Sequence, residues 1–223
     1  MKVIWLGQAG LLFETANTTI IVDPYLSNSV EAIEPKNKRR VAVNEEFLKI
    51  KPDIILLTHS HLDHTDPETL KHYLKEDSAV CVLASANAWT TVRKFGGNNN
   101  YVQFDRHTQW TENGIRFTAV KAQHSDPDAI GIIIEAEGKK YYVTGDTLYN
   151  KEIFADLPQD IDYVFLPING KGNNMNFCDG KEFCEKIGAK AIPLHCGLFD
   201  DLDMNAFEYQ NKSVPEFYKE VTL

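Results

Sequence analysis

The chain lacks the features that mark secreted or membrane-spanning proteins. It has 223 residues and only four cysteines, none in a CxxC spacing, so neither a disulfide framework nor a cysteine-based zinc site is expected. No apolar run approaches the roughly 20 residues of a membrane span. The apolar stretch after Met1 is also too short for the core of a signal peptide. We therefore expect a cytoplasmic protein with reduced thiols and no membrane partner.

Positive charge is scarce as well. The 23 lysines and arginines are outnumbered by 32 acidic residues, which gives a formal net charge of −9. Binding to a long polyanion rests mainly on Lys and Arg, so a nucleic-acid partner is disfavoured. The one basic run, residues 36–40, is most simply a solvated loop. The alternative is an anion-binding flap in which Arg39 and Arg40 contact the substrate.

What is present is the pattern of a globular α/β protein. Hydrophobic residues make up 43% of the chain, an ordinary value, and no linker interrupts it, so we expect one domain spanning residues 1–223. Apolar runs predict strands at 2–6, 11–14, 18–22, 54–57, 79–83, 101–104, 115–120, 130–135, 140–144, 161–166 and 191–194. Capping and periodicity predict helices at 44–50, 67–74, 86–95, 179–188 and 214–219. Blocks of strands broken by helices indicate two packed sheets with helices outside.

The strongest local signal is the sequence HSHLDH, from His59 to His64. It follows a short apolar run, so it is expected where a buried strand reaches the edge of a sheet. Imidazole nitrogens and carboxylate oxygens are ligands of divalent transition metals. Three of the chain's seven histidines fall within these six residues, which favours a metal motif over chance clustering. Asp66, directly before Pro67, is better interpreted as a helix cap than as a ligand.

Four further residues stand directly after predicted strands, where α/β proteins usually place their chemistry. Each is weak evidence alone, because an isolated histidine after a strand is more often a structural residue. His72 and His107 lack partners in the sequence and are interpreted as structural. The four residues at strand ends are Asp23, His124, Asp146 and His195.

In this order (Asp, HxHxDH, His, Asp and His, each after a strand) the chain resembles the metallo-β-lactamase superfamily of hydrolases over nearly its whole length. The resemblance implies an αββα four-layer sandwich of two mixed β-sheets flanked by helices, with metals at one sheet edge. This agrees with the strand and helix pattern reached from the residues alone.

The resemblance also implies roles for these residues. One cation would be held by the imidazole group, which is His59, His61 and His124. A second would be held by the mixed group, which is Asp63, His64 and His195. Asp146 would bridge the two cations, and Asp23 would orient the HxHxDH loop as an outer partner.

Four segments resemble more narrowly the ascorbate-6-phosphate lactonase-like (UlaG-like) branch. They are DPYLS from Asp23, GDTLY from Gly145, PINGKG from Pro167 and PLHCGLF from Pro193. This resemblance implies a small anionic substrate, either a lactone or a phosphorylated sugar derivative, and favours manganese where the wider superfamily favours zinc. It leaves a homo-oligomer open. Expected substrate contacts are Asn169, Lys171 and Tyr149, together with Arg39 and Arg40.

The expected activity is hydrolysis that depends on two divalent metal ions. Two such ions sharing a water would lower its pKa, and the resulting hydroxide would attack a carbonyl carbon or phosphorus. Asp63, Asp146 and His195 are the expected catalytic residues. The runner-up is a phosphodiesterase or nuclease-like hydrolase. The alternative of another class is a non-catalytic metal-binding module, since a fold alone does not fix function.

Overall fold

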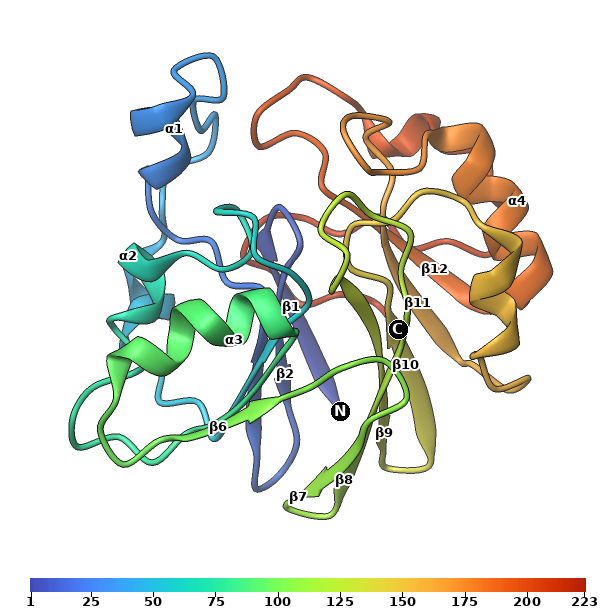
Figure 1. Cartoon of the computed structure of the whole chain (residues 1–223). Helices are drawn as coiled ribbons and strands as arrows, with labels where there is room; N and C mark the ends of the chain where they lie inside the picture. The colour runs from blue at the N-terminus through green and yellow to red at the C-terminus, as the bar shows by residue number, and fades with distance from the viewer.

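The computed structural model describes all 223 residues, and its strands form two six-stranded sheets (Figure 1). In the first sheet, strands β1 to β3 pair antiparallel and strands β3 to β6 pair parallel, in chain order. Their bounds are β1 (Lys2–Gly7), β2 (Gly10–Glu14), β3 (Thr19–Val22), β4 (Ile54–Leu57), β5 (Cys81–Ala84) and β6 (Asn100–Gln103).

The second sheet follows the same plan in chain order, with antiparallel pairs first and parallel pairs after them. Strands β7 to β10 pair antiparallel, and β10 to β12 pair parallel. Their bounds are β7 (Gln109–Glu112), β8 (Ile115–Lys121), β9 (Ile130–Ala136), β10 (Lys139–Val143), β11 (Tyr163–Pro167) and β12 (Lys190–Leu194). Each sheet is therefore mixed, as the sequence predicts.

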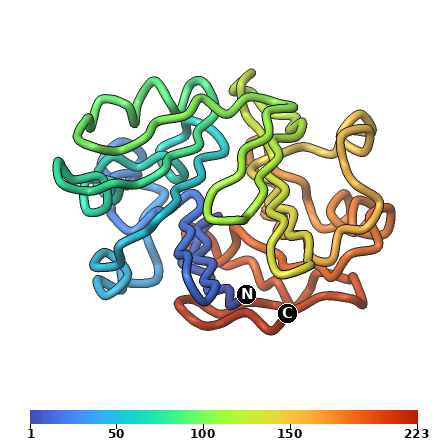
Figure 2. The backbone as a smooth tube through the Cα atoms, turned by 90° about the horizontal axis from the view of Figure 1, so that it is seen from below, coloured from blue at the N-terminus to red at the C-terminus, as the bar shows by residue number.

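Helices lie on the outer sides of the two sheets (Figures 1 and 2). Those beside the first sheet are α1 (Ser29–Ile33), α2 (Pro67–Leu70) and α3 (Ala86–Val92), whereas α4 (Phe177–Ile187) lies beside the second. Short 3-10 helices are η1 (Glu45–Lys49), η2 (Arg93–Phe95), η3 (Lys151–Ala155) and η4 (Met204–Ala206). This arrangement confirms the expected αββα sandwich. No helix has both the length and the apolar character needed to cross a bilayer.

Strand β1 shows why the strands are apolar on both faces. Val3 and Trp5 belong to the main core of 40 buried residues, which takes side chains from both sheets. Ile4 and Leu6 point the other way, into a second cluster that includes residues of α2 and α3. Successive side chains of a strand alternate between faces. Because both faces are covered, no polar alternation is left in the sequence.

Several local signals are confirmed. The Asp66 side chain accepts hydrogen bonds from the backbone N–H groups of Glu68 and Thr69, with Pro67 at the start of α2. Asn44 caps the expected short helix, which is the 3-10 helix η1. Gly188 ends α4 in the left-handed conformation, with φ of 75°. These elements depend on side-chain-to-backbone contacts within a few residues, which sequence reveals directly.

The helix predicted at 214–219 is wrong. This segment runs irregularly beside β1, where Tyr218 N–H donates to Trp5 O at 2.8 Å and Val221 N–H donates to Val3 O at 2.8 Å. The Phe217 ring stacks on Trp5 with centroids 4.2 Å apart. The edge of β1 leaves backbone groups without partners, and pairing with them outweighs the weak helical preference of so short a segment.

Other differences are smaller. Helix α1 and strand β7 are absent from the predicted elements, and α2 ends at Leu70 rather than near 74. Helix α4 begins at Phe177, two residues before the predicted start, because the Asn176 side chain accepts from Cys178 N–H and Asp179 N–H. None of these differences moves a candidate ligand.

Candidate metal centre

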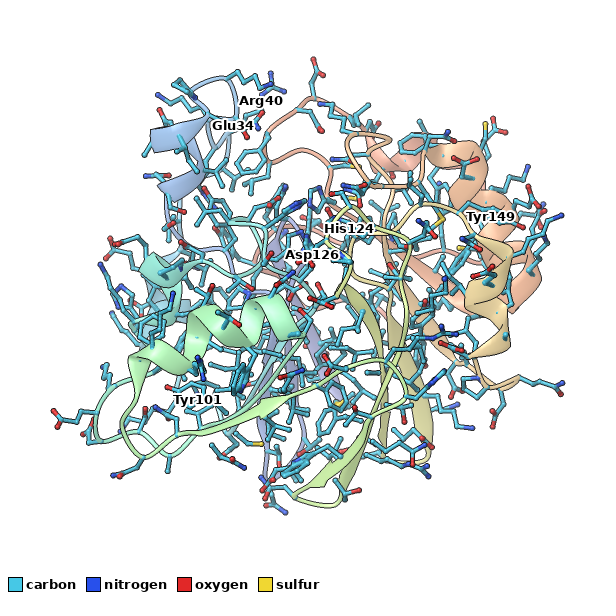
Figure 3. The ribbon with its side chains drawn as sticks, viewed as in Figure 1. Glu34, Arg40, Tyr101, His124, Asp126 and Tyr149 are labelled. Atoms are coloured by element: carbon cyan, nitrogen blue, oxygen red, sulfur yellow. The ribbon has the colours of Figure 1, made fainter.

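All the candidate ligands lie beyond the carboxyl ends of strands, at one edge shared by both sheets. The first sheet contributes Asp23 after β3 and the HxHxDH loop after β4, whereas the second contributes His124, Asp146 and His195 after β8, β10 and β12. Figure 3 shows His124 and Asp126 between the two halves of the molecule at this edge. Residues more than 130 positions apart in the sequence are therefore brought together by the sandwich.

The imidazole group is compact. His59, His61, His124 and Asp146 offer ligand atoms that all lie within 4.8 Å of one another. His59 Nε2, His124 Nε2 and Asp146 Oδ1 are buried and have no hydrogen-bond partner. Buried polar atoms without partners are rare because they are costly. A divalent cation would satisfy all three, so this donor set fits a metal ion.

The mixed group stands beside it. Asp63, His64 and His195 also offer atoms within 4.8 Å of one another, and His195 Nε2 lies 3.3 Å from Asp63 Oδ2. Asp146 Oδ1 lies 3.2 Å from His64 Nε2 and 3.5 Å from His195 Nε2. Since an Asp146 oxygen also lies within 4.8 Å of the ligand atoms of the imidazole group, its carboxylate faces both groups.

The two groups differ in their electrostatics. Burial lowers the pKa of His59 well below its ordinary value and that of His124 to about 4, so both rings are neutral and keep a lone pair for a metal. Burial also acts to lower the pKa of His64 and His195, but nearby carboxylates, Asp146 foremost, outweigh it and raise both values. The carboxylates near His64 and His195 therefore favour positive charge at a buried site.

Asp23 fixes the HxHxDH loop through contacts with Thr58, directly before the loop, and with His64 inside it. Asp23 Oδ1 accepts from the Thr58 N–H at 2.8 Å, and Asp23 Oδ2 accepts from the Thr58 hydroxyl at 2.5 Å. The same Oδ2 lies 2.8 Å from His64 Nδ1, and Thr58 Oγ1 lies 3.1 Å from His59 Nδ1. Partners on the Nδ1 side orient an imidazole and leave its Nε2 for a ligand.

Asp126 links the two sheets beside the cluster and was not among the predicted residues. Its side chain accepts from the Ser60 N–H at 3.0 Å, the Ser60 hydroxyl at 2.7 Å and the Asn87 amide at 2.7 Å. Its own N–H donates to His124 Nδ1 at 2.9 Å. Burial would raise the pKa of Asp126, but these hydrogen bonds prevail and lower it to about 2. A carboxylate two residues after a histidine at a strand end was the available signal.

Two carboxamides also contact the cluster and were missed. Gln8 Nε2 donates to Asp63 Oδ2 at 2.9 Å, and Asn174 Nδ2 donates to Asp146 Oδ2 at 3.1 Å. The carbonyl oxygens of both side chains are buried and lack partners. Gln8 was detectable as the one polar residue between Val3 and Phe13, whereas nothing in the sequence sets Asn174 apart from the neighbouring asparagines.

Three of the seven residues other than glycine with positive φ lie at the cluster. Gln8, Asp23 and His195 have φ values of 50°, 42° and 69°. Left-handed backbone is uncommon for residues other than glycine and costs on the order of 1–3 kcal/mol each unless the surroundings enforce it. The surroundings do so at Gln8, whose carbonyl accepts from the Trp5 indole at 2.9 Å and from the His195 N–H at 3.1 Å.

Gly145 lets the Asp146 loop approach the HxHxDH loop. Its φ is +60°, and a Cβ at this position would meet Ile130 O and the Thr58 Cβ at 2.9 Å each. Any other residue would push the two sheets apart at the cluster, so the GD pair has a steric reason beyond the carboxylate that follows it.

A cleft of about 560 Å³ opens above the cluster. Of the predicted substrate contacts, Asn169 and Lys171 line it. Asn169 Nδ2 lies 3.0 Å from His195 Nδ1, and Lys171 Nζ lies 3.2 Å from Asp200 Oδ2. In the basic run, Lys36 and Asn37 reach the cleft.

The other three predicted contacts do not line the cleft. The Tyr149 hydroxyl donates to Glu182 of α4 at 2.8 Å, and Figure 3 shows Tyr149 far from His124. The Arg39 guanidinium is buried and donates to Tyr25 O and to the Tyr218 hydroxyl, both at 2.9 Å. Arg40 is exposed at the surface.

Comparisons with known proteins agree with this arrangement. The chain matches the beta-lactamase superfamily domain over residues 18–195. It is 31% identical to a UPF0173 metal-dependent hydrolase of Geobacillus thermodenitrificans, with 89% of this chain and 87% of the relative covered. It is 30% identical to a UPF0173 metal-dependent hydrolase of Pyrococcus abyssi, with 100% and 96% covered.

A solved structure shares the fold. The metallo hydrolase Igni18 of Ignicoccus hospitalis superimposes with a TM-score of 0.76 at 20% identity, covering 100% of this chain and 97% of that one. Together with the family match and the relatives, this resolves the resemblance seen in the motifs: the chain belongs to the metallo-β-lactamase superfamily, among the UPF0173 metal-dependent hydrolases.

Proposed function

We propose that this protein is a dinuclear hydrolase of small lactones or phosphorylated sugar derivatives, related to the UlaG-like branch, and that residues 1–223 act as one cytoplasmic domain. The observation that carries the proposal is the position of Asp146 Oδ1. This buried atom has no hydrogen-bond partner and faces both the imidazole group and the mixed group. A single carboxylate between two sets of ligands suits two cations better than one.

The bound cations, zinc or manganese, would polarise the electrophile and lower the pKa of a water molecule. Asp146 is placed to orient that water and to accept its proton. Asn174 occupies Asp146 Oδ2, which keeps Oδ1 turned toward the ligand groups. Gln8 holds Asp63 differently, because it donates to Oδ2, the oxygen that lies 3.3 Å from His195 Nε2. Asp63 and His195 complete the catalytic set on the side of the mixed group.

The walls of the cleft would orient the substrate. Lys171 and Lys36 can attract an anionic group, and the Asn169 side chain lies next to His195. Neither lysine is buried, so their attraction is exposed to salt screening and steers the substrate more than it holds it. Small substrates suit a cleft of about 560 Å³, which is within the usual range for small-molecule sites.

The test is hydrolysis of a panel of lactones, phosphorylated sugars and a generic phosphodiester by protein loaded separately with Zn²⁺ and Mn²⁺. Metal content is measured for each preparation. We expect two metal ions per chain and turnover of at least one lactone or phosphorylated sugar. Turnover of the phosphodiester alone would instead support the phosphodiesterase alternative. Binding of metal without any turnover would support a non-catalytic module.

The matched variant is Asp146→Ala. Because Asp146 faces both ligand groups, its loss is expected to reduce turnover to background and to weaken retention of both metal ions. Leu148→Asn, two residues along and outside the cleft, controls for damage to the loop. An Asp146→Ala protein with near-normal rate and metal content would refute the proposal.

A further inference from the structure

The cleft above the cluster has two unlike walls. Polar residues after β11 form one side: Asn169, Lys171, Asn173 and Asn174. The four hydrophobic residues of the lining, which we call the apolar wall, are Val30, Ile33, Leu62 and Phe199; the polar residues Glu34, Lys36 and Asn37 line the cleft next to Ile33. Apolar side chains form no hydrogen bonds with phosphate or hydroxyl groups, so a site for such groups alone would not need the apolar wall.

The apolar wall is a continuous surface with its own small core. Val30 is buried with Tyr25 and Leu198, and Leu62 and Phe199 pack against this cluster. The Phe199 ring meets the Tyr25 ring edge-on, with centroids 5.7 Å apart. Ile33 follows Val30 by three residues in α1, so both side chains lie on one face of the helix. The wall is therefore held in place by packing beneath it.

Ile33 is the exposed end of this wall. It is 68% exposed, and the only other large hydrophobic residue classed as exposed in the protein is Leu148, at 39%. Single exposed apolar residues are common, but Ile33 lines the same cleft as the other three residues of the apolar wall. Leu62 connects the wall to the chemistry, because it stands between the candidate ligands His61 and Asp63.

We propose that the apolar wall binds an alkyl substituent of the substrate, and that the substrate class is a lactone or ester carrying a short alkyl chain. This inference rests on the proposed hydrolase function and adds its substrate class. A phosphorylated sugar is polar over its whole surface and would leave the wall in water. An alkyl chain gains free energy with each methylene that it buries there.

The reaction is ordinary ester hydrolysis. The oxygen of water adds to the carbonyl carbon, the acyl C–O bond breaks, and the displaced oxygen takes a proton. The products are a carboxylic acid and an alcohol, which remain parts of one molecule when the substrate is a lactone. The carboxylate product keeps the alkyl chain, so straight-chain carboxylates are suitable binding probes.

The test measures dissociation constants of acetate, butanoate, hexanoate and octanoate by calorimetry on the metal-loaded protein. Each added methylene is expected to tighten binding by about threefold until the chain outgrows the wall. Ile33→Asn should flatten this dependence on chain length. Leu148→Asn removes the other exposed large hydrophobic residue and should keep the wild-type slope. Ile33 is exposed, so thermal unfolding should be nearly unchanged in both variants.

A slope of Ile33→Asn equal to that of wild type, or a flat series in wild type, would overturn the inference. So would a wild-type dimer that Ile33→Asn converts to a monomer, because Ile33 would then belong to a subunit interface. Hydrolysis of γ-lactones with alkyl chains of increasing length separates the two proposals. Turnover without preference for chain length retains the hydrolase and rejects the wall, whereas chain-length-dependent binding without any turnover retains the wall and rejects the hydrolase.

Discussion

The two ligand groups share Asp146 but are built differently. In the imidazole group, the Nε2 atoms of His59 and His124 have no hydrogen-bond partner, and the ligand atoms of the group lie within 4.8 Å of one another. In the mixed group, the equivalent atoms already have polar neighbours, since His64 Nε2 and His195 Nε2 are 3.3 Å apart and Gln8 Nε2 lies 3.2 Å from His195 Nε2. The first group is preformed for a cation, whereas a cation entering the second must displace existing contacts.

Two ligand groups of similar composition can therefore differ in their affinity for a metal ion. A metal that binds the imidazole group satisfies atoms that otherwise lack partners, so little is lost on binding. A metal that binds the mixed group competes with hydrogen bonds among the protein's own side chains. We therefore expect the apoprotein to bind metal in two steps, with the imidazole group filled first.

The largest expected effect comes from removing one ligand of each group. His59→Ala should abolish the tighter binding step, and His195→Ala should abolish only the weaker one. Each loss should exceed the roughly 10–100-fold change that removal of an outer partner causes. Titration of the apoprotein with Zn²⁺, followed by calorimetry and metal analysis, measures both steps. Equal effects of the two variants on both steps would remove the distinction between the groups.

A smaller effect is expected from the two carboxamides. Asn174→Leu should weaken both steps, because Asn174 holds the shared Asp146. Gln8→Leu should weaken mainly the second, because Gln8 contacts Asp63 and His195. Losses of about 10–100-fold are typical for partners of metal ligands. Asn173→Leu, on the same loop and hydrogen-bonded only to Ser125, is the control. If it behaved like Asn174→Leu, general damage to the loop would explain both.

The smallest effect on metal binding is expected at Asp156, a carboxylate outside both ligand groups whose side chain is 5% exposed and accepts several hydrogen bonds. Arg106 donates to it at 2.6 and 2.8 Å, and Lys121 N–H at 2.9 Å. The Arg106 guanidinium, foremost among these groups, holds the pKa of Asp156 below its usual range. Asp156→Asn should reduce the free energy of unfolding by about 1–3 kcal/mol at neutral pH and leave metal binding unchanged.

The sign of its pH dependence follows from the lowered pKa. Above the unfolded value of about 3.9 the stabilisation by Asp156 is complete, and it is lost as the pH falls through the folded value. Urea unfolding at pH 7 and pH 3 should therefore show a smaller difference between wild type and Asp156→Asn in acid. A difference that grows in acid would contradict the assignment, as would any change in metal affinity.

Sequence predicted the site better than it predicted the ends of elements. The candidate ligands that the structure brings together could be chosen because chemistry limits metal donors to few residue types, and because strand ends put them at one edge. Asp23, at a turn after β3, was identified in the same way. The segment 214–219 could not be predicted correctly, because its structure depends on the edge of β1, more than 200 residues earlier.

The residues that were missed are of a different kind. Asp126 contacts Ser60 across the sandwich, Asn174 contacts Asp146 from a neighbouring loop, and each has a common residue type in a polar loop. The same reason explains why Tyr149 and Arg39 were expected in the cleft. Their side chains have the right chemistry for a substrate, but tertiary packing directs them to Glu182 and Tyr25. Type and strand position predict ligands, whereas supporting partners require coordinates.

The left-handed backbone at Gln8, Asp23 and His195 has a consequence for the evolution of this protein. Glycine would relieve the backbone strain at each position, yet it would remove the side chain that the cluster uses, together with its hydrogen bonds. Selection for stability and selection for activity therefore favour different residues at these three positions. Selection for thermal stability alone should enrich glycine at these positions and yield stable proteins without activity.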